Sequence, residues 1–147
     1  CDADLSTPIE ELDKMLAALN SGADVVFGSR ALPQSEVQVH QNILRETMGK
    51  TFNLFARLLA FRGVHDSQCG FKCFRKEAGH DLFGAAKIDG FCFDAEIAYL
   101  AQKKGYRLTE VPIIWKNSPQ SKVHLVADPL RMCGVLLRIR WLHRNDA

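Results

Sequence analysis

The sequence predicts an α/β protein in which a mostly parallel sheet is flanked by helices, and three observations support this class. Short apolar runs alternate along the chain with longer segments whose apolar residues recur at helical spacing. The run from Asp24 to Gly28 is continuous and apolar, as in strands buried on both faces. The 147 residues, 47% hydrophobic and 24% charged, suffice for one core. We therefore predict a single domain over residues 1–147.

The elements follow from these patterns in order. We expect helices over residues 8–20, 42–62, 76–83, 94–104 and 128–143, and strands over 24–28, 70–75 and 107–115. In the first helix Thr7 is the expected N-cap, Pro8 the first helical residue and Glu10 the capping-box partner. Pro112 favours an edge strand or a bulge. Residues 30–41 are polar and are expected to form a loop.

Composition excludes several kinds of partner and site. A net charge of +2 is too small to indicate a nucleic-acid partner. No apolar run reaches the length of a membrane-spanning helix. The five cysteines are odd in number and scattered, which favours reduced thiols in a cytosolic setting. Cys69 and Cys73 lack the second ligand pair that a structural zinc site needs.

Two carboxylates open the chain, Asp2 and Asp4, separated by one small residue. Both can turn toward one hard cation, and Mg²⁺ or Mn²⁺ commonly shares the phosphates of a substrate with one or two protein carboxylates. Aspartate is also common in turns between strands and helices, so a purely structural role is the alternative.

Basic residues at predicted element ends are candidates for binding phosphate. Arg30 follows the strand over 24–28, and ligands of open α/β sheets gather at the carboxyl ends of strands. Arg45 lies near the start of the long helix. Lys72 follows a turn that carries Asp66 and Gly70, where glycine permits close backbone approach to a ligand. The alternatives are solvated arginines and a turn-capping role for Asp66.

Two helix segments carry further candidates. Asp94 begins a predicted helix and could act as a general base, or simply as an N-cap. The last helix mixes apolar residues with arginines, so it could lie in a membrane interface, although packing on the domain is the favoured alternative. Its apolar members are Leu130, Cys133, Leu136, Leu137 and Trp141, and its basic members are Arg131, Arg138, Arg140 and Arg144.

Several of these pieces occur together in one order. They are Asp2 to Pro8, Gly28-Ser29-Arg30, Arg45 with Asn53, Asp66 to Lys72, Gly90 to Glu96, and Glu110 to Trp115. This order resembles family 2 glycosyltransferases that act on polyprenyl phosphates, above all the dolichyl-phosphate β-glucosyltransferases, with dolichyl-phosphate mannose synthases as near cousins. The resemblance covers nearly the whole chain, and the Asp-Ser-Gln-Cys-Gly-Phe-Lys run is its most specific part.

The resemblance implies roles for individual residues. Asp2 and Asp4 match the Asp-x-Asp motif that binds Mg²⁺ or Mn²⁺ and the diphosphate of a nucleotide sugar. Arg30 and Arg45, with Lys72, match the positions that receive the phosphate of the lipid acceptor. Asp94 falls where many family members keep a catalytic carboxylate, and Asp66 is a second catalytic candidate.

The resemblance also implies an activity and a fold: inverting transfer of glucose from UDP-glucose to a polyprenyl phosphate, by a peripheral protein at the cytosolic membrane face. The alternatives are a GDP-mannose enzyme and a non-catalytic, self-associating remnant. Residues 1–147 would form the C-terminal portion of a GT-A domain, a Rossmann-like fold. Because no initiator Met and no apolar strand precede Asp2, we expect the N-terminal nucleotide-binding half to be absent here, and a partner or homo-oligomer to complete the site.

Overall fold

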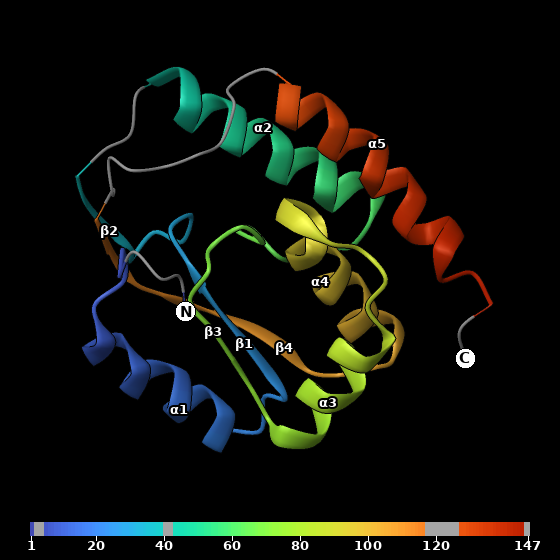
Figure 1. The fold of residues 1–147 in the computed structure, drawn as a ribbon. Coiled ribbons are helices and arrows are strands. Elements are labelled where there is room, and N and C mark those ends of the chain that lie inside the picture. The colour runs from blue at the N-terminus through green and yellow to red at the C-terminus, as the bar shows by residue number, and fades with distance from the viewer. Residues whose placement is uncertain (2–4, 40–42, 117–126, 146–147) are drawn as a thin grey trace.

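The computed structural model describes residues 1, 5–39, 43–116 and 127–145, and it confirms the α/β class. A three-stranded sheet in the order β3-β1-β4 lies between helices on its two faces (Figure 1). A second sheet of two strands, β2 and β5, continues beyond one end of the first. The candidate site residues lie mainly where the central strand ends.

The central strand β1 (Val25–Ser29) determines the layout of the main sheet. It pairs in parallel with β4 (Leu108–Pro112) and antiparallel with β3 (Lys72–Phe74), so the sheet is mixed. Phe27 lies opposite both Lys72 and Glu110. Because β3 runs in the opposite direction, its first residue lies toward the edge where β1 and β4 end. Three segments therefore deliver side chains to one edge.

The smaller sheet corrects two predictions. Residues 30–41, expected to be a loop, contain β2 (Glu36–Val39), which is mostly exposed and in which Val37 and Val39 alternate with polar residues over only four positions, a weak strand signal. The single strand expected over 107–115 is divided at Ile113 into β4 and β5 (Ile114–Lys116), which belong to different sheets. Pro112 ends β4, since it has no N–H for the ladder, and β4 is an edge strand of the described sheet, as predicted.

The first helix begins differently from the prediction. A 3₁₀ turn η1 (Ile9–Glu11) precedes α1 (Leu12–Asn20), and no side chain caps either element. Thr7 is therefore not the N-cap, and the Glu11 N–H bonds to the carbonyl of Pro8 at 3.1 Å. The expected capping box at Glu10 is replaced by Glu11, which is buried and accepts the N–H of Ile114 at 3.2 Å. Glu11 thus ties the helix start to β5.

The remaining helices lie close to their predicted positions. They are α2 (Ile43–Leu59), α3 (Lys76–Ala85), α4 (Phe93–Lys103), preceded by the 3₁₀ turn η2 (Gly90–Cys92), and α5 (Ala127–Leu142). Helix α1 covers one face of the main sheet, whereas α2, α4 and α5 lie on the other side (Figure 1). Among the described helices, none combines the length and the apolar character needed to cross a bilayer.

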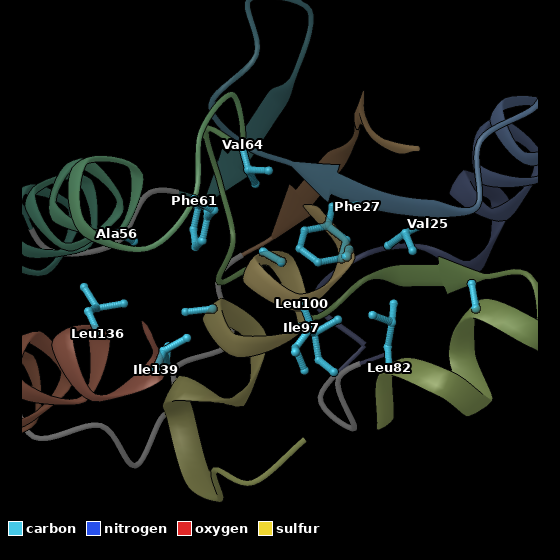
Figure 2. Close-up of a cluster of buried hydrophobic side chains, with 14 of the residues drawn as sticks. Val25, Phe27, Ala56, Phe61, Val64, Leu82, Ile97, Leu100, Leu136 and Ile139 are labelled. Carbon is cyan, nitrogen blue, oxygen red and sulfur yellow. The ribbon is translucent and has the colours of Figure 1, made fainter. Parts of the chain in front are cut away.

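Successive residues of β1 supply two separate cores, because side chains of a strand alternate between its faces. Val25 and Phe27 pack with residues of α2, α4 and α5 in the cluster drawn in Figure 2. Val26 packs with Met15 of α1 and with Trp115 of β5 in the second cluster. The two clusters hold β1 rigidly from both sides.

Gly28 lets two other segments approach the end of β1. A Cβ atom added there would lie 3.0 Å from the carbonyl oxygen of Phe71 and 3.1 Å from Cγ2 of Ile113. The Gly28 N–H also donates to that Phe71 carbonyl at 2.8 Å. The missing side chain therefore allows the segment before β3 and the crossing at Ile113 to close over the end of β1.

Candidate functional site at the end of the central strand

Arg30, the residue after β1, forms a bidentate ion pair with Asp66. Its Nε lies 2.6 Å from Oδ2 and its Nη2 lies 2.8 Å from Oδ1, while the backbone N–H of Arg30 donates to Oδ2 at 3.0 Å. The guanidinium carbon lies 5.1 Å from the ring centroid of Trp115. The side chain of Arg30 is 26% exposed and that of Asp66 only 3%. The buried carboxylate of Asp66 therefore holds the guanidinium in place, and solvent reaches the pair only at Arg30.

The turn that carries Asp66 is held by two other elements. Glu110 of β4 accepts the backbone N–H groups of His65 and Asp66. Oδ1 of Asn53, on α2, accepts the N–H of Ser67 at 3.1 Å and its hydroxyl at 3.0 Å, while Nδ2 lies 3.4 Å from Oδ1 of Asp66. Strand β4, helix α2 and the end of β1 thus meet at one turn.

The charge state of Asp66 follows from these contacts. Burial by itself raises the pKa of this carboxyl, but the charge and hydrogen bonds of Arg30 outweigh it, with a smaller contribution from Lys72. The net result is a pKa below the ordinary value of 3.8. Asp66 is therefore ionised at neutral pH and a weak base. The geometry suits it to orienting Arg30 rather than to removing a proton.

Lys72 and Asp94 form a second ion pair at the same edge. The ammonium lies 2.7 Å from Oδ1 of Asp94, and the two side chains are 6% and 12% exposed. Lys72 also donates to the carbonyl of Cys69 and lies 4.8 Å from the ring centroid of Phe27. Asp94 lies in the first turn of α4 and does not cap it, since the helix begins at Phe93 without a side-chain cap. Its carboxylate faces Lys72, at the edge where β1 ends.

The thiol of Cys69 is buried, and the charges of Asp66, Arg30 and Lys72 act on it. Burial, and after it the negative charge of Asp66, raise the pKa of this thiol from 9.0 to about 11. At neutral pH Cys69 is protonated, and a protonated thiol is a poor nucleophile. The most specific part of the sequence resemblance therefore contributes charge pairs and backbone geometry here, not a reactive cysteine.

Three of the predicted site groups lie outside the described part of the structure: the residues Asp2 and Asp4, and the side chain of Arg45. The backbone of Arg45 belongs to α2, eight residues before Asn53. Downstream of the acidic pair, Leu5 has a φ of 52° and the carbonyl of Ser6 accepts the N–H of Lys116 at 2.8 Å. The segment that follows the acidic pair is therefore tied to the end of β5.

No group of three or more His, Cys, Asp and Glu side chains that could hold a metal occurs among the described residues. Asp66 and Asp94 each face a cation from the protein instead. Asp2 and Asp4, the residues expected to bind Mg²⁺ or Mn²⁺, lie outside the described residues, and their carboxylate oxygens are the ligand type that these cations prefer.

Sequence reasoning missed the residues that hold the predicted ones in place. The sequence places Glu110 in a strand and at the start of the last ordered motif piece but assigns it no role, although a charged side chain in the middle of a strand signals a specific partner. Glu96, the last residue of the Gly90 to Glu96 motif piece, is fully buried against His143 of the C-terminal segment. Asp94 and Glu96, two residues apart on α4, therefore serve different parts of the molecule.

Comparison with known proteins gives consistent relatives, although no family model matches the chain. A dolichyl-phosphate beta-glucosyltransferase of Dictyostelium discoideum is 30% identical over 145 residues, which is 95% of this chain and 44% of the relative. Dolichyl-phosphate beta-glucosyltransferase ALG5C of Trichomonas vaginalis is 33% identical over 94% of this chain and 42% of the relative. A polyprenol monophosphomannose synthase of Mycolicibacterium smegmatis is 34% identical over 76% of this chain and 42% of the relative.

The chain is homologous to polyprenyl-phosphate glycosyltransferases. This confirms the resemblance predicted from the ordered motifs. The chain spans less than half the length of these curated relatives. In the described residues, the edge at the end of β1 carries two carboxylate–cation pairs, Arg30–Asp66 and Lys72–Asp94.

Proposed function

We propose that this chain takes part in transferring a sugar from a nucleotide donor to a polyprenyl phosphate, and that the edge at the end of β1 receives the acceptor's phosphate. One observation carries the proposal. The end of β1 and the start of β3 deliver Arg30 and Lys72 to the same edge, each oriented by a buried carboxylate. The relatives are named for dolichyl phosphate or polyprenol monophosphate, which are anionic lipids.

The proposed roles follow from position and charge. Arg30 and Arg45 bind phosphate oxygens of the acceptor, and Lys72 adds positive charge behind them while holding Asp94 in place. One phosphate oxygen forms a bond to the anomeric carbon as the bond from that carbon to the nucleoside diphosphate breaks, which inverts the anomeric centre. The attacking oxygen is already anionic, so Asp94 orients rather than deprotonates the acceptor.

We further propose that Asp2 and Asp4 bind Mg²⁺ or Mn²⁺ together with the donor's diphosphate. When bound, the metal would stabilise the negative charge that develops on the leaving nucleoside diphosphate. The preferred donor is UDP-glucose, because the dolichyl-phosphate beta-glucosyltransferases match over nearly the whole chain. GDP-mannose is the second candidate, supported by the polyprenol monophosphomannose synthase relative.

Calorimetric titration tests the metal and donor proposals together. We expect Mn²⁺ to bind with measurable heat, and binding to tighten at least about tenfold in the presence of the preferred nucleotide sugar, because the diphosphate completes the coordination. UDP-glucose and GDP-mannose are compared side by side. The double substitution Asp2→Asn with Asp4→Asn removes this heat, whereas Asp13→Asn on the exposed side of α1 keeps it. Equal heats for the double variant and the unaltered chain would support a non-catalytic remnant instead.

The helices α2 and α5 give the chain a surface suited to a membrane. Large apolar side chains are exposed on both: Leu54, Phe55 and Leu58 on α2, and Leu137 and Trp141 on α5. The exposed residues Arg138, Arg140 and Arg144 flank the apolar pair on α5, and the two helices lie side by side (Figure 1). Arginines beside exposed tryptophan and leucine suit an interface of anionic lipids, so we propose that this helix pair faces the cytosolic membrane surface.

Vesicle flotation measures this membrane contact. The chain is mixed with phosphatidylcholine vesicles that lack or contain phosphatidylserine or a polyprenyl phosphate. We expect co-flotation with the anionic vesicles, and about a tenfold lower partition coefficient when Leu137→Ser and Trp141→Ser remove apolar contacts. Leu16→Ser is the matched control, since Leu16 is exposed on α1, across the sheet. Equal flotation of all three proteins would refute a role for this surface.

A further inference from the structure

Glu110 links the rigid strand β4 to the turn at Asp66 through two successive backbone amides. Its Oε2 accepts the N–H of His65 at 2.8 Å, and its Oε1 accepts the N–H of Asp66 at 2.9 Å. Oε2 also lies 2.8 Å from Nδ1 of His65. The side chain of Glu110 is only 6% exposed, so water cannot readily replace these bonds.

The position of Glu110 in the sheet places it beside the two ion pairs. It lies opposite Phe27 in the β1–β4 register, and Phe27 is the residue whose ring contacts the Lys72 ammonium. Paired residues of neighbouring strands present their side chains on the same face of a sheet. The side chain of Glu110 therefore lies on the face covered by α2, α4 and α5, where it contacts the turn that carries His65 and Asp66.

We propose that Glu110 is a positioning residue that sets the orientation of the Arg30 guanidinium through Asp66. The contacts run from Glu110 to the Asp66 amide and from the Asp66 carboxylate to Nε and Nη2 of Arg30. Only a carboxylate offers an acceptor oxygen to each of two adjacent N–H groups. A carboxamide would satisfy one of them and turn its own NH₂ toward the other. The purpose of this arrangement, a preset phosphate-binding group, rests on the function proposed above.

The test is NMR spectroscopy of the Arg30 Nε–Hε group without any ligand. In Glu110→Gln we expect its hydrogen exchange with solvent to accelerate about tenfold, and its resonance to move toward the position found in Asp66→Asn. Glu110→Asp, which keeps both oxygens but shortens the side chain by one methylene, gives a smaller change of the same sign. If Glu110→Gln does not fold, Glu110→Asp alone decides the outcome.

Two controls separate positioning from general loosening. His65→Ala removes the imidazole but keeps the backbone N–H that Glu110 accepts, so the exchange rate of Arg30 Hε stays unchanged. Glu77→Gln, on the exposed side of α3, also leaves it unchanged. An unaltered Arg30 signal in the folded Glu110 variants overturns the inference. So does a change in His65→Ala as large as that in Glu110→Gln.

Titration with a short-chain polyprenyl phosphate then separates this inference from the proposed function. If the unaltered chain binds the lipid, we expect Glu110→Gln to bind it several-fold more weakly and His65→Ala to bind it equally well. If the unaltered chain does not bind the lipid at all, the proposed function fails. The ligand-free exchange rates of Arg30 Hε still decide whether Glu110 positions it.

Discussion

Replacing Asp66 with asparagine is expected to lower the free energy of unfolding by about 2–3 kcal/mol. The substitution removes the negative charge that faces Arg30 and puts an amide NH₂ against its N–H donors. Breaking a buried ion pair costs about 3–5 kcal/mol, and the partial exposure of Arg30 reduces this figure. Urea unfolding at neutral pH measures the loss. Asp89→Asn, at an exposed carboxylate before α4, is the control and should change stability little.

The same pair predicts how stability depends on pH. The pKa of Asp66 is lower in the folded chain than the ordinary value of 3.8. Its stabilising contribution is therefore fully present above that ordinary value and is lost as pH falls below it, toward the folded pKa. Urea unfolding from pH 5 to pH 3 should show a steeper loss of stability for the unaltered chain than for Asp66→Asn. Parallel curves would contradict the assignment of a lowered pKa.

Replacing Glu96 with alanine is expected to cost about 3–5 kcal/mol, the largest effect of any single substitution considered. Glu96 is fully buried and accepts the N–H groups of Lys87 and Ile88, each at 3.0 Å. Its Oε1 also lies 2.6 Å from Nε2 of His143, which is itself fully buried. Alanine would leave the buried imidazole of His143 and the partly buried N–H groups of Lys87 and Ile88 without this acceptor. Thermal unfolding should show a midpoint lower by about 10 °C or more.

A second variant separates the contact with His143 from the backbone contacts of Glu96. His143→Phe keeps the acceptor for Lys87 and Ile88 but removes the imidazole, so it should cost less than Glu96→Ala. The double variant should cost less than the sum of the two, because both substitutions remove one shared contact. A loss below about 1 kcal/mol for Glu96→Ala would show that this cluster does not hold α5 on α4.

The main elements of the fold were predictable because their signals are local. Helical spacing located α2 and α4 within a few residues, and the continuous apolar run located β1. The strand predictions that were wrong concern β2 and the division of residues 107–115, where the structure depends on contacts between distant segments. Strand β2 is largely exposed and only four residues long, so the alternation of its two valines with Glu36 and Gln38 is too short to stand out, and its pairing with β5 depends on contacts far along the chain. The division of residues 107–115 depends on which sheet each half joins.

The candidate site was predictable as a set of residues but not as a set of pairs. Motif order brought Arg30, Asp66, Lys72 and Asp94 together, and the structure places all four at one edge of the sheet. Which cation each carboxylate faces depends on the antiparallel direction of β3, and no local pattern reveals that direction. The supporting role of Glu110 depends likewise on the register of β4 against β1.

Binding of a short-chain polyprenyl phosphate, compared with the alcohol of the same chain length, tests the central claim most directly. We predict that the phosphate binds at least about tenfold more tightly, because charge-assisted hydrogen bonds to its oxygens exceed those to a hydroxyl. Arg45→Ala should weaken phosphate binding about tenfold, whereas Arg62→Ala, beyond the end of α2, should not. Equal affinities for phosphate and alcohol would contradict the assignment of this edge to the acceptor's phosphate, and an unaffected Arg45→Ala variant would contradict the proposed role of Arg45.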